Sequence, residues 1–474
     1  MISNKEFRSF AHQIADWMAD YLQQVEQYAV KPELGPGEIF NQIPAKAPDN
    51  GEDMAAIFND FKRIIIPGMA HWQSPNWFAY FQANSSYASV LAEMLTATLG
   101  AQCMLWDTSP AAAELEERMM QWLRDLTGLP ANLEGVIQDT ASTSTLCAIL
   151  TARERASEFE INTRGFDHDH FRVYASEQAH SSVDKAVRIA GLGINNLIKI
   201  ETDDSLAMDP GKLEEAIKSD LQKEYIPLCA VATIGTTGTL AMDPLQAIGK
   251  ICRNHKLWLH VDAAYAGTAM ALPEHRWMIK GIEYADSYVF NPHKWMFTNF
   301  DCSAFFVTDK KSLTRTFSIM PEYLRTAVDD RVNNYRDWGI QLGRRFRALK
   351  LWFVLRNYGA EGIRHVLRNH IAWVQNMAED IEKQTDFEIM APYPLNMVCF
   401  RYHPDNVDDP EKLNELNRQL LANLNRSGKI YITHTTINGN YIIRFVAGQT
   451  RLEERHVLDA WQLIKTEARK LKPS

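Results

Sequence analysis

Three short apolar runs decide the fold: LCAVATIG (residues 228–235), LWLHVDAAYAG (257–267) and SYVFNP (287–292). Runs of this length without regular polar alternation are typical of strands that are buried on both faces. Stretches with helical patterns separate the three runs. This alternation indicates parallel strands joined by helices.

The same alternation continues on both sides of these runs. Further apolar runs are GVIQD (135–139), FRVYAS (171–176), LIKIE (197–201) and SAFFVT (303–308). Together they predict a doubly wound α/β domain with a mainly parallel sheet. A long helical pattern at 342–359 is followed by four more runs, FEIMAP, NMVCFRY, YITHTT and YIIRFVAG. These suit a small antiparallel sheet with helices on one side.

The N-terminal segment has a different pattern. From Phe7 to about Tyr28, apolar residues recur at spacings of three and four, which predicts an amphipathic helix. The following stretch, 31–53, is rich in proline and glycine and predicts an extended connector. We therefore expect the first helix to pack on a distant part of the chain or on another chain.

Composition sets the general class. The 474 residues are 46% hydrophobic and 23% charged, as in an ordinary globular protein with two or three regions. The net charge of −9, with basic and acidic residues mixed, argues against nucleic-acid binding. The six cysteines form no C-x-x-C pair, so we expect reduced, mostly buried thiols rather than disulfides or a zinc site.

The first residues do not resemble a secretion signal, because Lys5, Glu6 and Arg8 interrupt any apolar core. No segment approaches the roughly 18 apolar residues of a membrane span. We therefore expect a cytoplasmic protein that binds no membrane. FDHDHF (166–171) has the spacing of a metal site but lacks further ligands nearby, so no metal is predicted.

Lys294 and Asp262 are candidates for chemistry. Lys294, in SYVFNPHKW, comes just after a buried strand, where open α/β sheets bind ligands, although a lone lysine is usually an exposed loop residue. Asp262 lies inside an apolar pattern, and a buried carboxylate is costly unless it is paired. The pyridine nitrogen of pyridoxal phosphate would be such a partner, since a carboxylate keeps it protonated. The alternative is a structural aspartate that caps the next turn.

A possible phosphate site lies at GVIQDTASTSTLCAILTARERA (135–156), where a strand leads through small hydroxyl residues into a helix. Ala141 and Ser142 could offer free backbone N–H groups at the positive end of the helix dipole. An ordinary N-cap explains the same residues. Each of these features alone has an ordinary structural explanation. A phosphate site, a buried carboxylate and a lysine that all follow strand ends indicate a pyridoxal-phosphate site more specifically than any one of them.

Eight motifs resemble the aromatic-L-amino-acid decarboxylases, within the group II pyridoxal-phosphate decarboxylases. They are HWQSPNWFAYFQANSSY, QDTASTSTL, SEQAHSSVDKA, HVDAAYAG, NPHKW, NFDCSAFFV, MPEYL and LGRRFRALKLW, in order from about residue 70 to 360. The resemblance implies a fold-type I enzyme with pyridoxal 5'-phosphate as cofactor. It also implies a homodimer with its active site at the interface and N-terminal helices that wrap the partner.

The resemblance divides the chain into three regions. These are an N-terminal helical dimerisation segment (1–85), a large cofactor-binding α/β domain (86–347) and a small C-terminal α+β domain (348–474).

The resemblance also assigns residues to the cofactor. Lys294 is similar to the lysine that binds the cofactor covalently, Asp262 to the partner of the ring nitrogen, and His180 to the imidazole stacked on the ring. Ala264 resembles the small residue on the other ring face and Thr236 the threonine beside the ring. The family's phosphate contacts correspond to Ala141, Ser142, Asn291 and His293.

Two residues are implicated in the reaction itself. A stacked His180 can help to orient the substrate carboxylate. Tyr323, in MPEYL, resembles the tyrosine that donates a proton to Cα after carbon dioxide leaves.

The substrate pocket follows from the same resemblance. Trp72, Tyr80 and Phe81 are similar to its aromatic wall, which favours a flat aromatic side chain. Gln102 and Met104 stand at positions that the family fills from the partner chain. Gly343 replaces the serine of relatives that prefer phenolic substrates, which leaves space for an indole. We therefore expect tryptophan-like as well as phenyl-type substrates, with tyrosine, phenylalanine and DOPA included.

Three alternatives remain open at this point. The same scaffold could carry out oxidative conversion to an aldehyde, which in relatives accompanies loss of the stacked histidine or the tyrosine. His180 and Tyr323 are both present, which favours decarboxylation. Histidine, glutamate or diaminobutyrate could be the substrate instead. A cofactor-free scaffold is the third alternative, because a fold never guarantees an activity.

Overall fold

The computed structural model of the protein describes residues 2–167, 170–319 and 331–471. The chain forms two units. The first comprises Met1–Gln82, Asn376–Glu388 and Phe400–Ser474, and the second Ala83–Gln375 and Ile389–Cys399. The three regions expected from the sequence remain a prediction.

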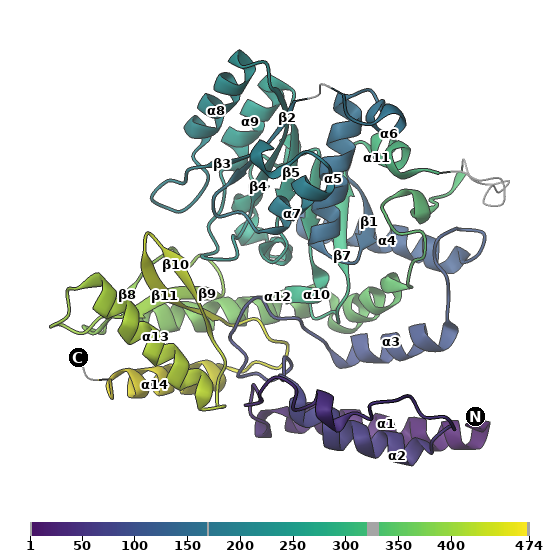
Figure 1. The fold of residues 1–474 in the computed structure, drawn as a ribbon, viewed down its shortest axis with the longest axis vertical. Coiled ribbons are helices and arrows are strands. Elements are labelled where there is room, and N and C mark those ends of the chain that lie inside the picture. Colours follow the sequence, from purple (N-terminus) through teal and green to yellow (C-terminus); the bar gives the residue numbers. More distant parts are fainter. Residues whose placement is uncertain (1, 168–169, 320–330, 472–474) are drawn as a thin grey trace. The chain divides into compact units, whose positions relative to one another are not determined.

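A seven-stranded sheet forms the centre of the second unit (Figure 1). Its strands are β1 (Glu134–Gln138), β2 (Phe171–Ser176), β3 (Leu197–Ile200), β4 (Ile226–Thr233), β5 (Trp258–Asp262), β6 (Ser287–Phe290) and β7 (Ser303–Val307). The spatial order is β1-β7-β6-β5-β4-β2-β3. Five neighbouring strands from β6 to β3 are parallel, and β7 is antiparallel to both β6 and β1.

The strand directions position the site. Because β1 and β6 are both antiparallel to β7, they run in the same direction. All strands except β7 therefore end at one edge of the sheet, which we call the carboxyl edge. The predicted mainly parallel α/β fold is confirmed.

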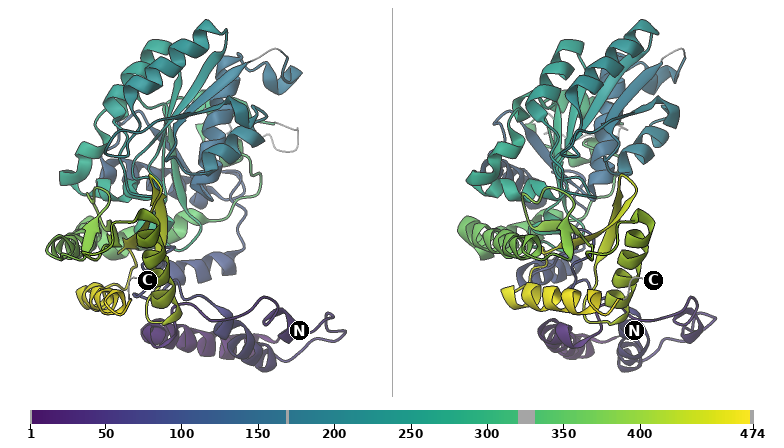
Figure 2. Two further views of the ribbon diagram at one scale, coloured as in Figure 1. Left: turned by 60° about the vertical axis from the view of Figure 1, so that its left-hand side comes forward. Right: turned by 90° about the vertical axis from the view of Figure 1, so that its left-hand side faces the viewer.

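Helices cover both faces of this sheet (Figure 2). Those of the second unit are α3 (Tyr87–Leu99), α4 (Pro110–Thr127), α5 (Ala141–Ala156), α6 (Ile161–Arg164), α7 (Ser182–Ile189), α8 (Pro210–Gln222), α9 (Leu245–His255), α10 (Pro292–Trp295) and α11 (Lys310–Phe317). Helices α5 and α7 pack on β2 and β4 through a buried apolar cluster that includes Ile149, Val187 and Val231. Such burial on both faces explains why the strands read as continuous apolar runs.

The first unit contains α1 (Asn4–Gln24), α2 (Met54–Asp60), α13 (Pro410–Arg426) and α14 (Glu454–Ala468). Ser3 and Glu6 form a capping box that begins α1. The second sheet has the order β10-β11-β9-β8, with strands β8 (Phe387–Ile389), β9 (Met397–Tyr402), β10 (Thr433–Ile437) and β11 (Asn440–Val446). The long helix α12 (Arg347–Glu382) is interrupted at Gly359, whose φ of 64° lies in the left-handed region that favours glycine.

The six cysteines are free and buried, as predicted. None of the helices in the described ranges combines the length and apolarity needed to cross a bilayer.

Candidate active site

The carboxyl edge brings together most of the residues that the sequence assigns to the cofactor. Strands β4, β5 and β6 are neighbours, and their registers place Thr233 opposite Asp262 and Asp262 opposite Val289. Thr236, Asp262 and Lys294 therefore lie at or just beyond adjacent strand ends. Three segments from distant parts of the sequence converge because parallel strands end at the same edge.

Asp262 is the last residue of β5 and is only 5% exposed. Its Oδ1 accepts a hydrogen bond from the backbone N–H of Ala264 at 3.0 Å. Asp262 therefore does cap the next turn, which was the structural alternative. The charge of this carboxylate also acts on the neighbouring Lys294 and His180.

Lys294 lies on α10, the short helix that follows β6. Burial lowers the pKa of its amine, and the nearby Asp262 carboxylate raises the pKa and offsets part of this effect. A lysine with a lowered pKa has more of the neutral amine that attacks a carbonyl group. Asn84 holds the turn, because its Nδ2 donates to the carbonyl oxygen of Lys294 at 2.5 Å.

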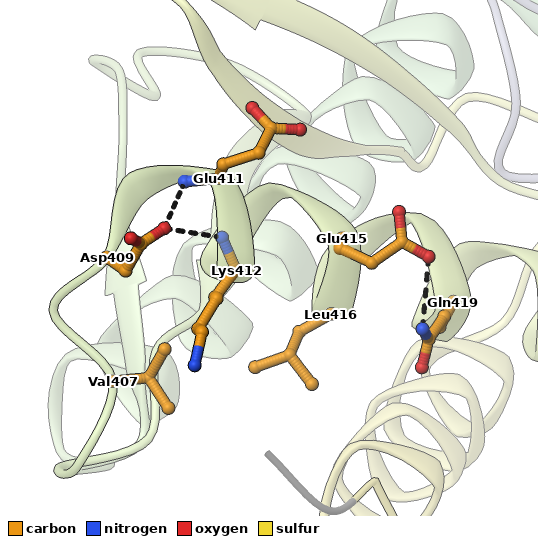
Figure 3. A pocket seen from close by; sticks show the side chains of 7 residues that line it. All are labelled: Val407, Asp409, Glu411, Lys412, Glu415, Leu416 and Gln419. Atoms are coloured by element: carbon orange, nitrogen blue, oxygen red, sulfur yellow. Dashed lines mark hydrogen bonds between the residues drawn. The ribbon is translucent and has the colours of Figure 1, made fainter. Parts of the chain in front are cut away.

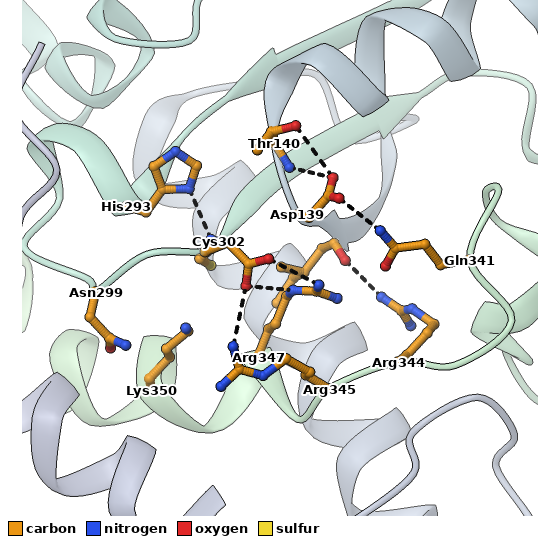
Figure 4. Close-up of polar contacts among 12 residues, drawn as sticks. Asp139, Thr140, His293, Asn299, Cys302, Gln341, Arg344, Arg345, Arg347 and Lys350 are labelled. Atoms are coloured by element: carbon orange, nitrogen blue, oxygen red, sulfur yellow. Dashed lines mark hydrogen bonds and ion pairs between the residues drawn. The ribbon is translucent and has the colours of Figure 1, made fainter. Parts of the chain in front are cut away.

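His293, next to Lys294, is buried and has a fixed tautomer. Its Nδ1 accepts a hydrogen bond from the backbone N–H of Cys302 at 2.9 Å (Figure 4). Burial, followed by the charges of Lys294 and Lys350, lowers the pKa of His293 to about 3. The neutral ring therefore carries its proton on Nε2, which can donate to an anion.

The start of α5 offers a second set of donors at this edge. The Thr140 side chain caps the helix by accepting from the N–H of Thr143. Within the described structure, the N–H groups of Ala141 and Ser142 have no acceptor, as expected in a first helical turn. Asp139 accepts from Gln341 Nε2 at 2.7 Å and from the N–H of Thr140 at 2.6 Å, which fixes this turn (Figure 4).

Asn291 and Thr236 complete the polar groups at the edge. The Oδ1 of Asn291 is buried and has no hydrogen-bond partner among the described residues. Such an orphaned amide is costly unless a ligand satisfies it. Thr236 is completely buried, and its Oγ1 accepts from the N–H of Ala241 at 3.1 Å, which orients the hydroxyl.

His180 follows the end of β2 and is an exposed residue. Its Nδ1 accepts a hydrogen bond from the N–H of Ser182 at 3.1 Å, so the neutral ring is protonated on Nε2. Desolvation is the main reason why the pKa of His180 is lowered. The negative charge of Asp262 acts in the opposite direction, and the positive charge of Lys294 lowers the pKa further. His180 therefore lies within electrostatic range of Asp262 and Lys294. Ala264 is partly exposed beside them.

The residues predicted for the aromatic wall lie in the first unit. The ring of Trp72 stacks on Trp77 at 4.2 Å and on Tyr80 at 5.9 Å between centroids. Tyr80 is 46% exposed and has a φ of 56°, a strained conformation for a tyrosine. Phe81 is buried, and the guanidinium of Arg444 lies 5.7 Å from its ring centroid. Trp72, Trp77 and Tyr80 therefore form a stack of aromatic rings.

Gln102 and Gly343 lie side by side. The Oε1 of Gln102 accepts from the N–H of Arg344 at 2.7 Å. A Cβ atom at Gly343 would lie 3.2 Å from Gln102 Nε2. The carbonyl of Met104 accepts from the N–H of Arg336 at 3.0 Å, so the loop containing Gln102 and Met104 is tied to the segment before α12.

The residues at the carboxyl edge fit pyridoxal 5'-phosphate. Lys294 supplies a partly buried amine, Asp262 a buried carboxylate, and His293 an oriented N–H donor. The free N–H groups at the start of α5 suit a phosphate. One edge of the sheet thus carries N–H donors that can bind a phosphate. The same edge carries a carboxylate that can pair with a ring nitrogen.

Several residues and one hollow are not part of the group of residues at the carboxyl edge. Tyr323 is outside the described residues, as are His168 and Asp169. No group of three or more metal-binding side chains occurs within the described ranges. A hollow of about 310 Å³ on α13 shares no residue with the predicted site (Figure 3). It is lined by Val407, Asp409, Glu411, Lys412, Glu415, Leu416 and Gln419.

Sequence reasoning missed several residues that hold the site. Asn84 was within a quoted motif, but only the structure shows that it binds the carbonyl of Lys294. Cys302 acts on His293 through its backbone, so no side-chain signal could have revealed it. Gln341 is 202 residues from Asp139, and sequence spacing gives no sign of their contact.

Comparisons with known proteins agree with this geometry. Residues 36–403 match the model described as "Pyridoxal-dependent decarboxylase conserved domain". The chain is 41% identical to phenylacetaldehyde synthase of Arabidopsis thaliana, over 98% of this chain and 96% of that protein. It is 40% identical to tyrosine decarboxylase 4 of Petroselinum crispum, over 98% and 93%.

A solved structure is similar over nearly the whole fold. The crystal structure of Oryza sativa TDC with PLP and tryptamine superposes with a TM-score of 0.96 at 33% identity and covers 99% of both chains. The matched domain, the full-length relatives and the residues at the carboxyl edge lead to one assignment. The chain belongs to the group II pyridoxal-phosphate-dependent decarboxylase family.

Proposed function

We propose that this protein removes the α-carboxyl group of an aromatic L-amino acid and releases carbon dioxide and the corresponding amine. The observation that carries the proposal is the partly buried Lys294 amine near the Asp262 carboxylate, at an edge with donors for a phosphate. The relatives named above support the substrate class, because they include a tyrosine decarboxylase and a structure that holds tryptamine.

The cofactor supplies an electron sink, which accepts the electron pair that the departing carboxyl group leaves behind. Lys294 binds the cofactor covalently, and the charge of Asp262 keeps the ring nitrogen protonated. His293, Asn291 and the N–H groups of Ala141 and Ser142 would hold the phosphate, and Thr236 would contact the ring. The ring N–H of His293 and the backbone N–H groups of Ala141 and Ser142 can donate to a phosphate, which supports this part of the proposal.

The remaining roles concern the substrate. His180 would stack on the cofactor and orient the substrate carboxylate, and Ala264 would pack against the cofactor. Trp72, Tyr80 and Phe81 contact the aromatic side chain, and the stacking of Trp72 on Tyr80 supports this role for these two residues. Tyr323 donates the proton that replaces the lost carboxyl group at Cα.

A homodimer and a cytoplasmic location belong to the same proposal. Helix α3 exposes Tyr87, Leu91, Leu95 and Leu99 at spacings of four, an apolar stripe that suits a subunit interface. Six free, buried thiols support a reducing compartment.

A panel of L-amino acids tests the substrate class. We expect carbon dioxide and amine from tryptophan, tyrosine, phenylalanine or DOPA, and much slower release from histidine, glutamate and 2,4-diaminobutyrate. The measurement is carbon dioxide release together with chromatography of the products. Preference for one of the aliphatic or imidazole substrates would contradict the aromatic assignment and leave the cofactor site unaffected.

Formation of an aldehyde is the competing outcome, since one relative is a phenylacetaldehyde synthase. That reaction consumes oxygen and water and gives aldehyde, carbon dioxide, ammonia and hydrogen peroxide. We expect wild-type protein in air to give amine with little peroxide, because both His180 and Tyr323 are present. Stoichiometric peroxide would identify an aldehyde synthase instead.

Tyr323→Phe tests the proton donor. The variant keeps the ring but loses the acidic hydroxyl, so we expect carbon dioxide release to persist in part while product shifts from amine to aldehyde. The measurement is the amine-to-aldehyde ratio in air for wild type and variant with one aromatic substrate. If Tyr323→Phe makes amine alone at the wild-type rate, another group donates the proton.

Gly343→Ser tests the basis of ring preference. A new Cβ would lie 3.2 Å from the flexible end of Gln102, so the variant should fold with a small shift of that side chain. We expect kcat/KM for tryptophan to fall about tenfold relative to that for tyrosine, since one side-chain atom in a pocket discriminates to this extent. Gly343→Ala separates added volume from the hydroxyl. An unchanged tryptophan-to-tyrosine ratio in both variants would exclude Gly343 from substrate selection.

A further inference from the structure

Trp295, the residue after Lys294, is completely buried and ends helix α10. Its ring stacks on that of Tyr265, with centroids 5.1 Å apart and an angle of 4° between the planes. Its indole N–H donates to Nδ1 of His370, on α12, at 3.0 Å. The indole of Trp295 therefore connects the turn after β5 with helix α12.

His370 is an unexpected residue for this position. It is completely buried, and burial lowers its pKa to about 3, so the ring is neutral. Because Nδ1 accepts from Trp295, the proton of His370 is on Nε2, and this N–H has no partner in the described part of the chain. An apolar side chain would avoid that cost. The acceptor that His370 provides for Trp295 explains why a histidine occurs here.

Tyr265 is a fixed surface for the indole. It comes three residues after Asp262, it is 1% exposed, and its hydroxyl accepts from Asn396 Nδ2 at 2.6 Å. Backbone hydrogen bonds already join the two turns, since the N–H of Asn291 donates to the carbonyl of Ala264 at 2.9 Å. The Trp295 ring adds a side-chain connection between the turn that carries Asp262 and the turn that carries Lys294.

We propose that Trp295 and His370 are positioning residues that hold the α10 turn against the β5 turn and so keep the Lys294 amine beside Asp262. The proposal rests on the proposed role of Lys294 as the cofactor lysine. Neither residue needs to contact a reacting atom. Loss of their hydrogen bond moves the turn, and a misplacement of roughly 1 Å can cost about 100-fold in rate.

His370→Leu and His370→Asn separate the hydrogen bond from the packing. Leucine fills the space but leaves the buried indole N–H without an acceptor, whereas asparagine places an amide oxygen near the position of Nδ1. We expect loaded His370→Leu to lose its cofactor to hydroxylamine about tenfold faster than wild type. The pH midpoint of the bound-cofactor absorbance band should also shift. His370→Asn should restore both properties toward wild type.

Trp461→Phe is the matched control. The indole of Trp461 is 2% exposed and donates to Asp380 Oδ2, also on α12, at 2.6 Å. This variant therefore loses a comparable hydrogen bond that is not attached to Lys294. It should lower the thermal midpoint, as we also expect of Trp295→Phe, but leave cofactor release and the absorbance midpoint unchanged.

The double variant Trp295→Phe/His370→Leu distinguishes loss of the hydrogen bond from general misfolding. It removes donor and acceptor together, so it leaves no unsatisfied indole N–H, and its defects should be smaller than the sum of the single defects. The proposal is overturned if His370→Leu releases cofactor and titrates like wild type, or if Trp461→Phe shows the same changes as His370→Leu. A wild-type protein that takes up no cofactor on Lys294 would overturn the proposed function itself.

Discussion

Lys294→Ala is expected to lower decarboxylation to below about 10⁻⁴ of the wild-type rate while leaving the fold intact. Lys294 supplies the only amine within NPHKW that can bind the cofactor covalently, and its lowered pKa favours the neutral amine. Steady-state amine formation and thermal unfolding measure the two parts of this prediction.

Lys350 provides a control for the loss of a buried lysine. It is 1% exposed, and its Nζ lies 3.1 Å from Glu93 Oε2 (Figure 4 shows Lys350). Lys350→Ala should affect stability but still bind cofactor covalently and release carbon dioxide. Substantial turnover by Lys294→Ala would refute its assignment as the cofactor lysine.

Asp262→Ala is expected to lower the decarboxylation rate by about 10³-fold, the upper end of what removal of one electrostatic partner costs. Without the carboxylate, the ring nitrogen loses its proton and the cofactor becomes a weaker electron sink. Asp262→Glu should recover little activity. Measured kcat for the variants, with cofactor occupancy checked by absorbance, tests the prediction.

Asp262→Asn separates the two roles that the structure gives this residue. An amide oxygen can still accept from the N–H of Ala264, so the turn should remain capped, but the charge is lost. We expect near-wild-type stability together with a rate close to that of Asp262→Ala. A near-normal rate for Asp262→Asn would show that the carboxylate has only the capping role.

Much of the fold could be predicted from the sequence. Each apolar run from 135 to 308 corresponds to a strand, with ends that differ by up to five residues, as in LWLHVDAAYAG against Trp258–Asp262. The runs were clear because both faces of these strands are buried. The order of strands and the antiparallel direction of β7 could not be predicted from these runs, since they depend on pairings between distant segments.

The site could be predicted where side-chain chemistry is visible in the sequence. Lys294, Asp262 and the start of α5 lie at the same edge, as their positions after strands suggested. The contacts of His370 and Cys302 could not be foreseen, because one depends on a buried helix face and the other on a backbone N–H. Tyr323 remains a prediction from resemblance.

The most direct test of the account is reduction of the wild-type holoenzyme with borohydride, followed by peptide mapping by mass spectrometry. We predict a yellow protein in which reduction bleaches the colour and attaches one pyridoxyl phosphate group to the peptide containing Lys294. Lys350 and the other lysines should be unmodified at stoichiometric cofactor. A colourless protein that pyridoxal phosphate cannot restore, or attachment at another lysine, would contradict the central claim that Lys294 holds the cofactor.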